Sequence, residues 1–149
     1  MKSTLVLLAT VLFVASVSAI DWDTPAWKQE LRETQLEALH LVIKIRNAFD
    51  ESASCDELQK IIDTGKQELK INIEQTIRGI EEISGEKAEE VVRQFEGPIK
   101  VFCDSLDANF KEYKSDHKYL DSMDIQMLLD QADFAGAVED IVSKCTPNV

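Results

Sequence analysis

The amino-acid sequence predicts an all-α fold, an antiparallel four-helix bundle, from three observations. Apolar residues recur every three or four positions along four separate stretches, which is the period of an amphipathic helix. The 149 residues include only five glycines and three prolines, too few for the many turns of an all-β domain. The links between the stretches are short, and short links place consecutive helices side by side in opposite directions.

The first nineteen residues have the pattern of an export signal. Lys2 gives a positive start, an apolar run extends from Thr4 to Ala15, and Val17-Ser18-Ala19 resembles a signal cleavage site. The run is shorter than the roughly 20 residues that span a bilayer. We therefore expect a cleaved signal peptide over 1–19, a single helical domain over 20–149, and a secreted, extracellular protein without a membrane span.

The first predicted helix runs from Thr24 to Phe49. Thr24 is a candidate N-cap, and Pro25 suits the first helical position because its missing N–H would have no partner there. The apolar face of this helix consists of Trp27, Leu31, Ala38, Val42, Ile45 and Phe49, widened by Leu36, Leu39 and Ile43.

The second predicted helix begins with a capping box and ends at Ser84-Gly85. In this box the Ser54 hydroxyl and the Glu57 carboxylate satisfy each other's backbone N–H groups. Its many isoleucines favour a strand by propensity, but they are spaced by three and four, so the periodicity predicts a helix. The apolar positions are Leu58, Ile61, Ile62, Leu69, Ile73, Ile77, Ile80 and Ile83.

The third predicted helix contains Gly97-Pro98, where proline removes a hydrogen bond and crowds the preceding turn. We expect the helix to be kinked there, or split into two shorter helices so that the bundle has five helical segments. Its apolar positions are Ala88, Val91, Val92, Phe95, Ile99, Phe102, Leu106, Phe110 and Tyr113.

The last predicted helix starts near Asp121 or Ser122 and stops at Thr146-Pro147. Its apolar positions are Ile125, Leu128, Leu129, Ala132, Ala135, Val138, Ile141 and Val142.

Three cysteines follow the predicted signal, so an oxidising compartment would allow one disulfide and leave one thiol over. Straight antiparallel helices would set Cys103 about eleven residues, or ~16 Å, out of level with either Cys55 or Cys145, whereas a disulfide tolerates ~7 Å between Cα atoms. Bends at Gly97-Pro98 and Gly136 would bring Cys145 toward Cys103. All three pairings stay open, Cys103 with Cys145 is the favoured one, and the remaining thiol is a candidate for a covalent dimer.

The charge and the motifs exclude several classes of function. The net charge of −12 repels phosphate backbones and anionic lipid headgroups, which argues against nucleic-acid binding. His40, between two leucines, is interpreted as a partly buried packing residue and His117 as a solvated one, and neither has a neighbour at metal-ligand or triad spacing. We expect no enzymatic activity, no cofactor and no metal.

Three residues are candidates for contact with a ligand or partner. Trp22 and Trp27 flank the start of the first helix and would form an aromatic lip, although Trp27 also suits one end of the core. Asn72, together with Thr76, interrupts the apolar face of the second helix and is either a polar spot inside the bundle or an outward-pointing side chain.

Two functions of different classes fit these features. The first is a non-enzymatic interaction protein that acts on an extracellular protein partner through its acidic helical faces. The second is a carrier of a small hydrophobic ligand, such as a fatty acid or other lipid, because the apolar faces are wider than one stripe and the Gly97-Pro98 kink would hold the bundle open. A ligand cavity between the helices would favour the carrier.

Overall fold

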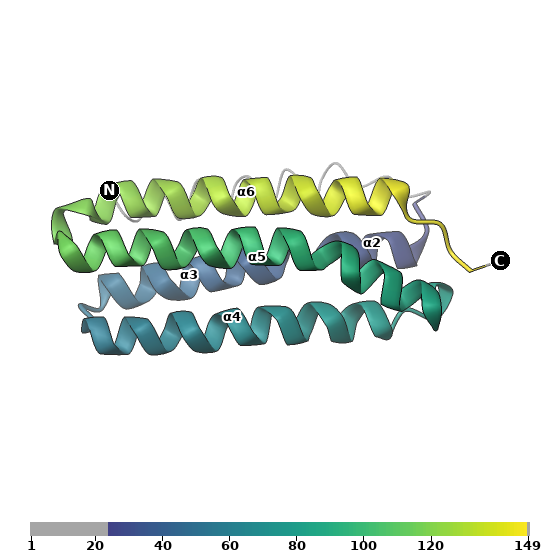
Figure 1. The fold of residues 1–149 in the computed structure, drawn as a ribbon, viewed down its shortest axis with the longest axis horizontal. Coiled ribbons are helices and arrows are strands. Elements are labelled where there is room, and N and C mark those ends of the chain that lie inside the picture. Colours follow the sequence, from purple (N-terminus) through teal and green to yellow (C-terminus); the bar gives the residue numbers. More distant parts are fainter. Residues whose placement is uncertain (1–23, 149) are drawn as a thin grey trace.

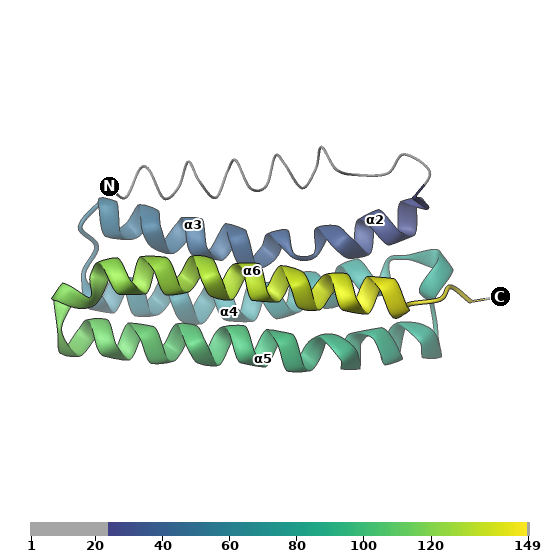
Figure 2. The same cartoon turned by 90° about the horizontal axis from the view of Figure 1, so that it is seen from above.

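The computed structural model describes residues 24–148, and these form an all-helical structure in which four long helices pack together. The helices α3 (Leu36–Asp50), α4 (Cys55–Arg78), α5 (Glu86–Ser115) and α6 (Leu120–Lys144) lie side by side along the long axis (Figures 1 and 2). The pairs α3–α4, α4–α5, α5–α6 and α3–α6 are in contact, so the four helices surround one core. The predicted signal peptide lies outside the described residues.

The predicted apolar faces supply most of this core. Burying them removes apolar area from water, which stabilises the fold by about 25 cal/mol per Å². The apolar side chains without exposed surface are Leu31, Ala38, Val42, Ile45, Leu58, Ile62, Ile73, Ile77, Ile83, Val91, Met123, Val138 and Val142. None of the helices described is long and apolar enough to cross a membrane.

The first predicted helix is in fact two helices, because a short helix, α2 (Ala26–Glu33), precedes α3. At the junction, the Thr34 hydroxyl donates to the carbonyl of Leu31 at 2.6 Å. Backbone bonds from Thr34 and Gln35 reach only three residues back, which tightens the turn. A buried threonine that bonds its own helix backbone in this way competes with the regular helical pattern.

The short helix α2 packs against α6 and α4. Arg32 donates two hydrogen bonds of 2.7 and 2.8 Å to the carboxylate of Glu139 on α6. The hydrogen bond from the Arg32 guanidinium lowers the pKa of Glu139. This bidentate ion pair fixes the orientation of α2 on the side of the bundle.

The two helix starts differ in how well they were predicted. The capping box of α4 is confirmed: Glu57 N donates to Ser54 Oγ and Ser54 N donates to Glu57 Oε2, each at 3.2 Å. For α2 the predicted Thr24 cap is wrong, because Pro25 occupies the N-cap position without a side-chain hydrogen bond, and its carbonyl accepts from Lys28 N.

The second predicted helix is shorter than expected, since α4 ends at Arg78 rather than at Ser84-Gly85. The following link still belongs to the core. Ile80 and the last residue of a 3-10 turn, η1 (Glu81–Ile83), are only 2% and 0% exposed. Gly85 then reverses the chain with a φ of 63°, a left-handed conformation that glycine adopts without a steric penalty.

Of the two outcomes predicted at Gly97-Pro98, the structure has the kink and not the split, because α5 continues through Pro98. In Figure 1 the teal N-terminal part of α5 bends away from the line of its green remainder, which is the expected response to an internal proline. Phe95 before the proline and Ile99 after it are both buried, and they share one face only if the helix continues. The helix break that the sequence did not predict lies between α2 and α3.

The start of α6 is turned relative to the predicted apolar face. Ile125 and Leu129, predicted to be buried, are each 53% exposed, whereas Asp124 is 1% exposed. Asp124 forms an ion pair with Arg46 of α3, with 3.8 Å between Oδ1 and Nη1, and the Arg46 side chain is 2% exposed. A buried charge pair in the α3–α6 contact therefore occupies a position that the hydrophobic pattern assigned to apolar side chains.

The favoured disulfide between Cys103 and Cys145 does not form in this structure, where all three cysteines are free. Burial raises the pKa of the Cys145 thiol, and Lys87 and Glu90 lie close enough to its sulfur to lower and to raise that pKa. Both of these residues are in the first turns of α5. Cys103 is about fifteen residues further along that helix, or ~22 Å at 1.5 Å per residue. Because α5 is not split and α6 has no break, the level difference expected for straight helices remains.

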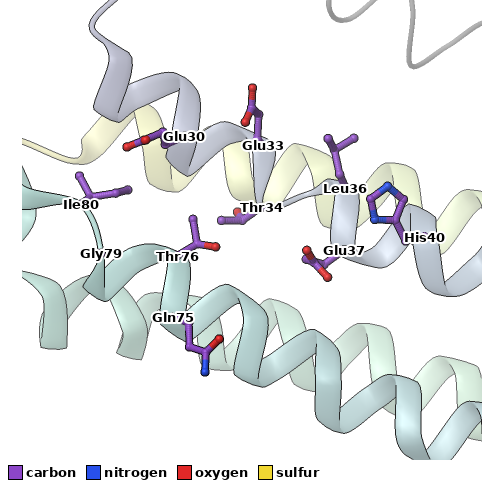
Figure 3. Close-up of a pocket in the computed structure, with 10 residues that line it drawn as sticks. All are labelled: Glu30, Glu33, Thr34, Leu36, Glu37, His40, Gln75, Thr76, Gly79 and Ile80. Atoms are coloured by element: carbon purple, nitrogen blue, oxygen red, sulfur yellow. The ribbon is translucent and has the colours of Figure 1, made fainter.

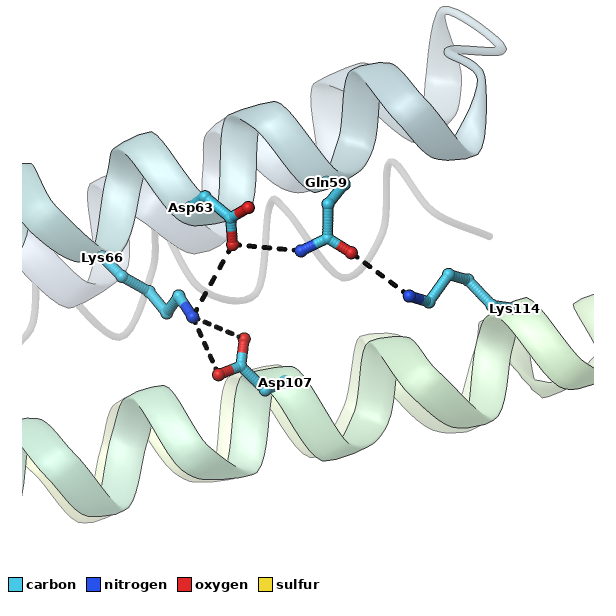
Figure 4. Close-up of polar contacts among 5 residues, drawn as sticks. All are labelled: Gln59, Asp63, Lys66, Asp107 and Lys114. Atoms are coloured by element: carbon cyan, nitrogen blue, oxygen red, sulfur yellow. Dashed lines mark hydrogen bonds and ion pairs between the residues drawn. The ribbon is translucent and has the colours of Figure 1, made fainter.

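Polar contacts on the surface connect α4 to α5 (Figure 4). Lys66 Nζ lies 2.8 Å from both carboxylate oxygens of Asp107 on α5 and 3.7 Å from Asp63 on α4. Burial lowers the pKa of Lys66, but the hydrogen bond to Asp107 and the nearby carboxylates outweigh it and raise the pKa overall. Lys114 donates to Gln59, which donates in turn to Asp63. Such partly exposed contacts each contribute about 0–1 kcal/mol.

Candidate functional site

A groove lies where the junction of α2 and α3 passes the C-terminal end of α4 (Figure 3). Its volume is about 460 Å³, within the range of small-ligand and peptide side-chain sites. We call it the acidic groove. It is lined by Glu30, Glu33, Thr34, Leu36, Glu37, His40, Gln75, Thr76, Gly79 and Ile80.

Two local features of the sequence create this hollow. The tight turn at Thr34 interrupts the first helical segment, so α2 and α3 do not present a continuous surface to α4. On the other side, α4 ends at Arg78, and Gly79 leads directly to the buried Ile80. The floor is therefore made of Thr34 and Ile80, both buried, and the rim is made of polar side chains that are exposed apart from the half-buried Glu37.

Carboxylates dominate the rim of the acidic groove. Glu30 and Glu33 lie one turn apart on α2, and Glu37 follows in the first turn of α3. In Figure 3, Glu30 and Glu37 point into the space beside α4, and Glu33 stands at the outer edge. The ten lining residues include these three glutamates and no lysine or arginine. The site therefore carries negative charge in a concave surface, which concentrates its field.

Hydrogen bonds hold part of this rim in place. Asn72 of α4 donates to Glu37 Oε2 at 3.1 Å, and this contact is partly buried. The Thr76 hydroxyl donates to the carbonyl of Asn72 one turn earlier at 2.9 Å. Asn72 thus fixes the direction of the Glu37 carboxylate from below the groove, while the second oxygen of that carboxylate remains able to accept a hydrogen bond from a ligand.

His40 corrects one sequence interpretation. It is exposed at the end of the acidic groove rather than packed between its leucine neighbours. Leu39 and Leu41, by contrast, are 6% and 3% exposed. The imidazole adds a group that can donate or accept a hydrogen bond beside the carboxylates.

A second groove lies between α5 and α6, at the bend of α5. Its volume is about 350 Å³, and we call it the apolar groove. Val101, which is 69% exposed, contributes to one side, and the rings of Phe102 and Phe134 lie beneath it with centroids 5.9 Å apart. The lining residues are Gly97, Pro98, Val101, Phe102, Asp130, Asp133, Phe134 and Ala137.

The three predicted contact residues have separate positions. Trp22 lies outside the described residues, and Trp27 is 9% exposed and belongs to the hydrophobic core rather than to a surface lip. Asn72 adjoins the acidic groove through Glu37. The glutamates of the rim were not singled out from the sequence, although their three-and-four spacing was a detectable signal.

Among residues 24–148 no group of three or more histidine, cysteine, aspartate or glutamate side chains is arranged to hold a metal ion. A scan against protein-family models found no match, and searches of curated proteins and of solved structures found no significant match either. The assignment of function therefore depends on the geometry of the grooves.

Proposed function

We propose that the protein is a secreted, non-enzymatic interaction protein, folded as an antiparallel four-helix bundle, that binds an extracellular protein partner through the acidic groove. The observation that supports this proposal most directly is the concave rim, whose lining residues include three glutamates and no lysine or arginine. The short links between the four packed helices support the antiparallel arrangement. The predicted export signal supports the extracellular location.

The groove favours a partner with lysine or arginine side chains in an accessible segment. Each carboxylate on the rim can accept charge-assisted hydrogen bonds, which are stronger than neutral ones. The apolar floor at Ile80 and the side chain of Leu36 suit the aliphatic stem of a long basic side chain. The negative charge of the whole chain would accelerate encounter with such a partner.

The first test is a binding titration with a labelled oligolysine peptide. We expect the variant Glu30→Gln/Glu33→Gln/Glu37→Gln to bind it roughly tenfold more weakly, because each exposed ion pair contributes about 0.2–1 kcal/mol. Fluorescence anisotropy measures the affinity at about 0.05 and 0.2 M salt. The affinity should fall at the higher salt concentration, because the shorter Debye length screens the charge interactions.

The matched control removes three carboxylates elsewhere. Glu51, Glu96 and Glu112 are exposed, lie outside the acidic groove, and their change to glutamine alters the net charge equally. We expect this control to bind the peptide within about twofold of the unchanged chain. Equal weakening by both triple variants would show that only total charge matters and would contradict a site in the groove.

The alternative function, a carrier of a small hydrophobic ligand, is favoured by one specific observation. The apolar groove lies where the sequence predicted that the Gly97-Pro98 kink would open the bundle, and Phe102 and Phe134 give it an aromatic base. Its volume of about 350 Å³ is at the lower end for small-molecule sites.

The carrier hypothesis predicts that the protein takes up a fluorescent fatty acid, measured by the change in its emission on binding. It also predicts that substitutions in the apolar groove reduce this uptake. Val101→Asp places a charge on the exposed wall without disturbing a buried residue, and we expect it to reduce uptake by roughly tenfold or more if the ligand lies there. Ile71→Asp on α4 is the matched control, because Ile71 is also exposed and is distant in sequence from the groove. Absence of uptake by the unchanged chain would remove this function.

A further inference from the structure

A cysteine and a histidine that are 62 residues apart in sequence meet at one end of the molecule. Cys55 is the first residue of α4, and His117 opens the 3-10 turn η2 (His117–Tyr119) that links α5 to α6. Cys55 Sγ lies 3.8 Å from His117 Nε2, a hydrogen-bond distance for sulfur. Cys55 is half-buried and His117 is exposed, so small molecules in solution have access to the pair.

Aromatic packing holds the histidine ring beside the sulfur. The imidazole of His117 stacks on the ring of Tyr113, with centroids 4.5 Å apart and an interplanar angle of 11°. Tyr113 is itself fixed by an edge contact with Phe49 of α3, at 4.9 Å between centroids. The histidine is therefore oriented by groups from two other parts of the fold, and it does not depend on the flexibility of an exposed side chain alone.

The other two cysteines have different surroundings. Burial raises the pKa of the Cys103 thiol and of the Cys145 thiol. A raised pKa reduces the fraction of thiolate, which is the nucleophilic form. Cys55 alone among the three contacts a histidine that can accept its proton.

We propose that Cys55 is a reactive thiol that exchanges with low-molecular-weight disulfides, with His117 as its proton acceptor. The thiol proton passes to His117 Nε2, and the sulfur of Cys55 attacks one sulfur of the small disulfide. The S–S bond breaks, its electron pair leaves on the second sulfur, and that thiolate takes the proton from the imidazolium. One mixed disulfide forms and one small thiol is released, so no other oxidant is required.

The charge near Cys55 selects the type of disulfide. Asp56 and Glu57 follow it in the first turn of α4, and Asp116 and Lys118 flank His117, so three carboxylates and one ammonium group lie beside the pair in sequence. These carboxylates repel an anionic reagent and attract a cationic one. They also oppose a symmetric dimer, which would bring two acidic helix starts together. We therefore assign a neutral or cationic small disulfide as the partner, in preference to a second copy of the chain.

The test compares the three cysteines within one molecule. The purified full chain is incubated with cystamine, a cationic disulfide, and peptide mapping by mass spectrometry follows the adduct at each cysteine over time. We expect Cys55 to react at least about tenfold faster than Cys103 and Cys145. The same comparison with oxidised glutathione, which is anionic, should give a slower reaction at Cys55.

Variants separate the role of the histidine from mere exposure. His117→Gln should slow the reaction of Cys55 about tenfold and leave the rates at the other two cysteines unchanged. Gln67→Ala changes an exposed side chain of α4, twelve residues from Cys55 and outside both grooves, and should change none of the three rates. Equal rates at the three cysteines, or an unchanged Cys55 rate in His117→Gln, would overturn the proposal. A doubled-mass species linked through Cys55 without a small adduct would also contradict it.

Discussion

Replacement of Asp124 by alanine is expected to lower the free energy of unfolding by about 3–5 kcal/mol. Asp124 and its ion-pair partner Arg46 are 1% and 2% exposed, so water cannot solvate the guanidinium that the substitution leaves behind. The loss should exceed that of any exposed ion pair, such as Lys100 with Asp104, because solvent screens an exposed pair. Urea unfolding followed by circular dichroism measures the difference.

The control for this prediction removes both charges together. Arg46→Met/Asp124→Leu replaces the pair with apolar side chains of similar size, which is often neutral or stabilising by about 1–4 kcal/mol. We expect the double variant to be at least as stable as the unchanged chain. A double variant as unstable as Asp124→Ala would show that volume and packing, rather than the buried charge, cause the loss.

Phe95→Ala is expected to destabilise the protein by about 3–5 kcal/mol, because it leaves a cavity in a packed core. The Phe95 side chain is 1% exposed and lies one turn before the bend of α5. Val101→Ala, on the same helix but 69% exposed, is the control and should change stability by less than about 0.5 kcal/mol. Similar losses in the two variants would contradict the assigned core face of α5.

Helical periodicity and helix caps are the sequence features from which the fold could be predicted. The three-and-four spacing of Ile62, Leu69 and Ile73 identified the buried face of α4, and the Ser54 capping box identified its start. These signals are local, because a helix must present one apolar face and must satisfy its first N–H groups. They predicted the all-helical class that the structure shows.

The errors arise where tertiary contacts override a local pattern. Thr34 has an acceptable helix propensity, and only its burial against the backbone of Leu31 breaks the helix there. The face of α6 was misassigned because Asp124 is buried against Arg46, and a charged residue is ordinarily assigned to the surface. At Pro98 the sequence left a kink and a split open, and the kink occurs because the two halves of α5 bury the same face.

The candidate sites could be predicted only in part. The polar interruption at Asn72 and Thr76 was recognised, and both residues belong to the acidic groove or support it. The contact between Cys55 and His117 was not foreseen, although the antiparallel alignment that separates Cys55 from Cys103 by about eleven residues sets Cys55 close to the start of η2. Trp27 belongs to the core, which was one of the two roles that its position at a helix start suggested.

The central claim, that the acidic groove is the binding site, is tested most directly by NMR titration of the isotopically labelled protein with the oligolysine peptide. The account predicts that backbone amide shifts concentrate in residues 30–40 and 75–80, the two segments that line the groove. It also predicts that these shifts disappear in the variant that lacks the three rim glutamates. Shifts spread evenly over the acidic faces of α4, α5 and α6, or concentrated at residues 97–102 and 130–137, would contradict it.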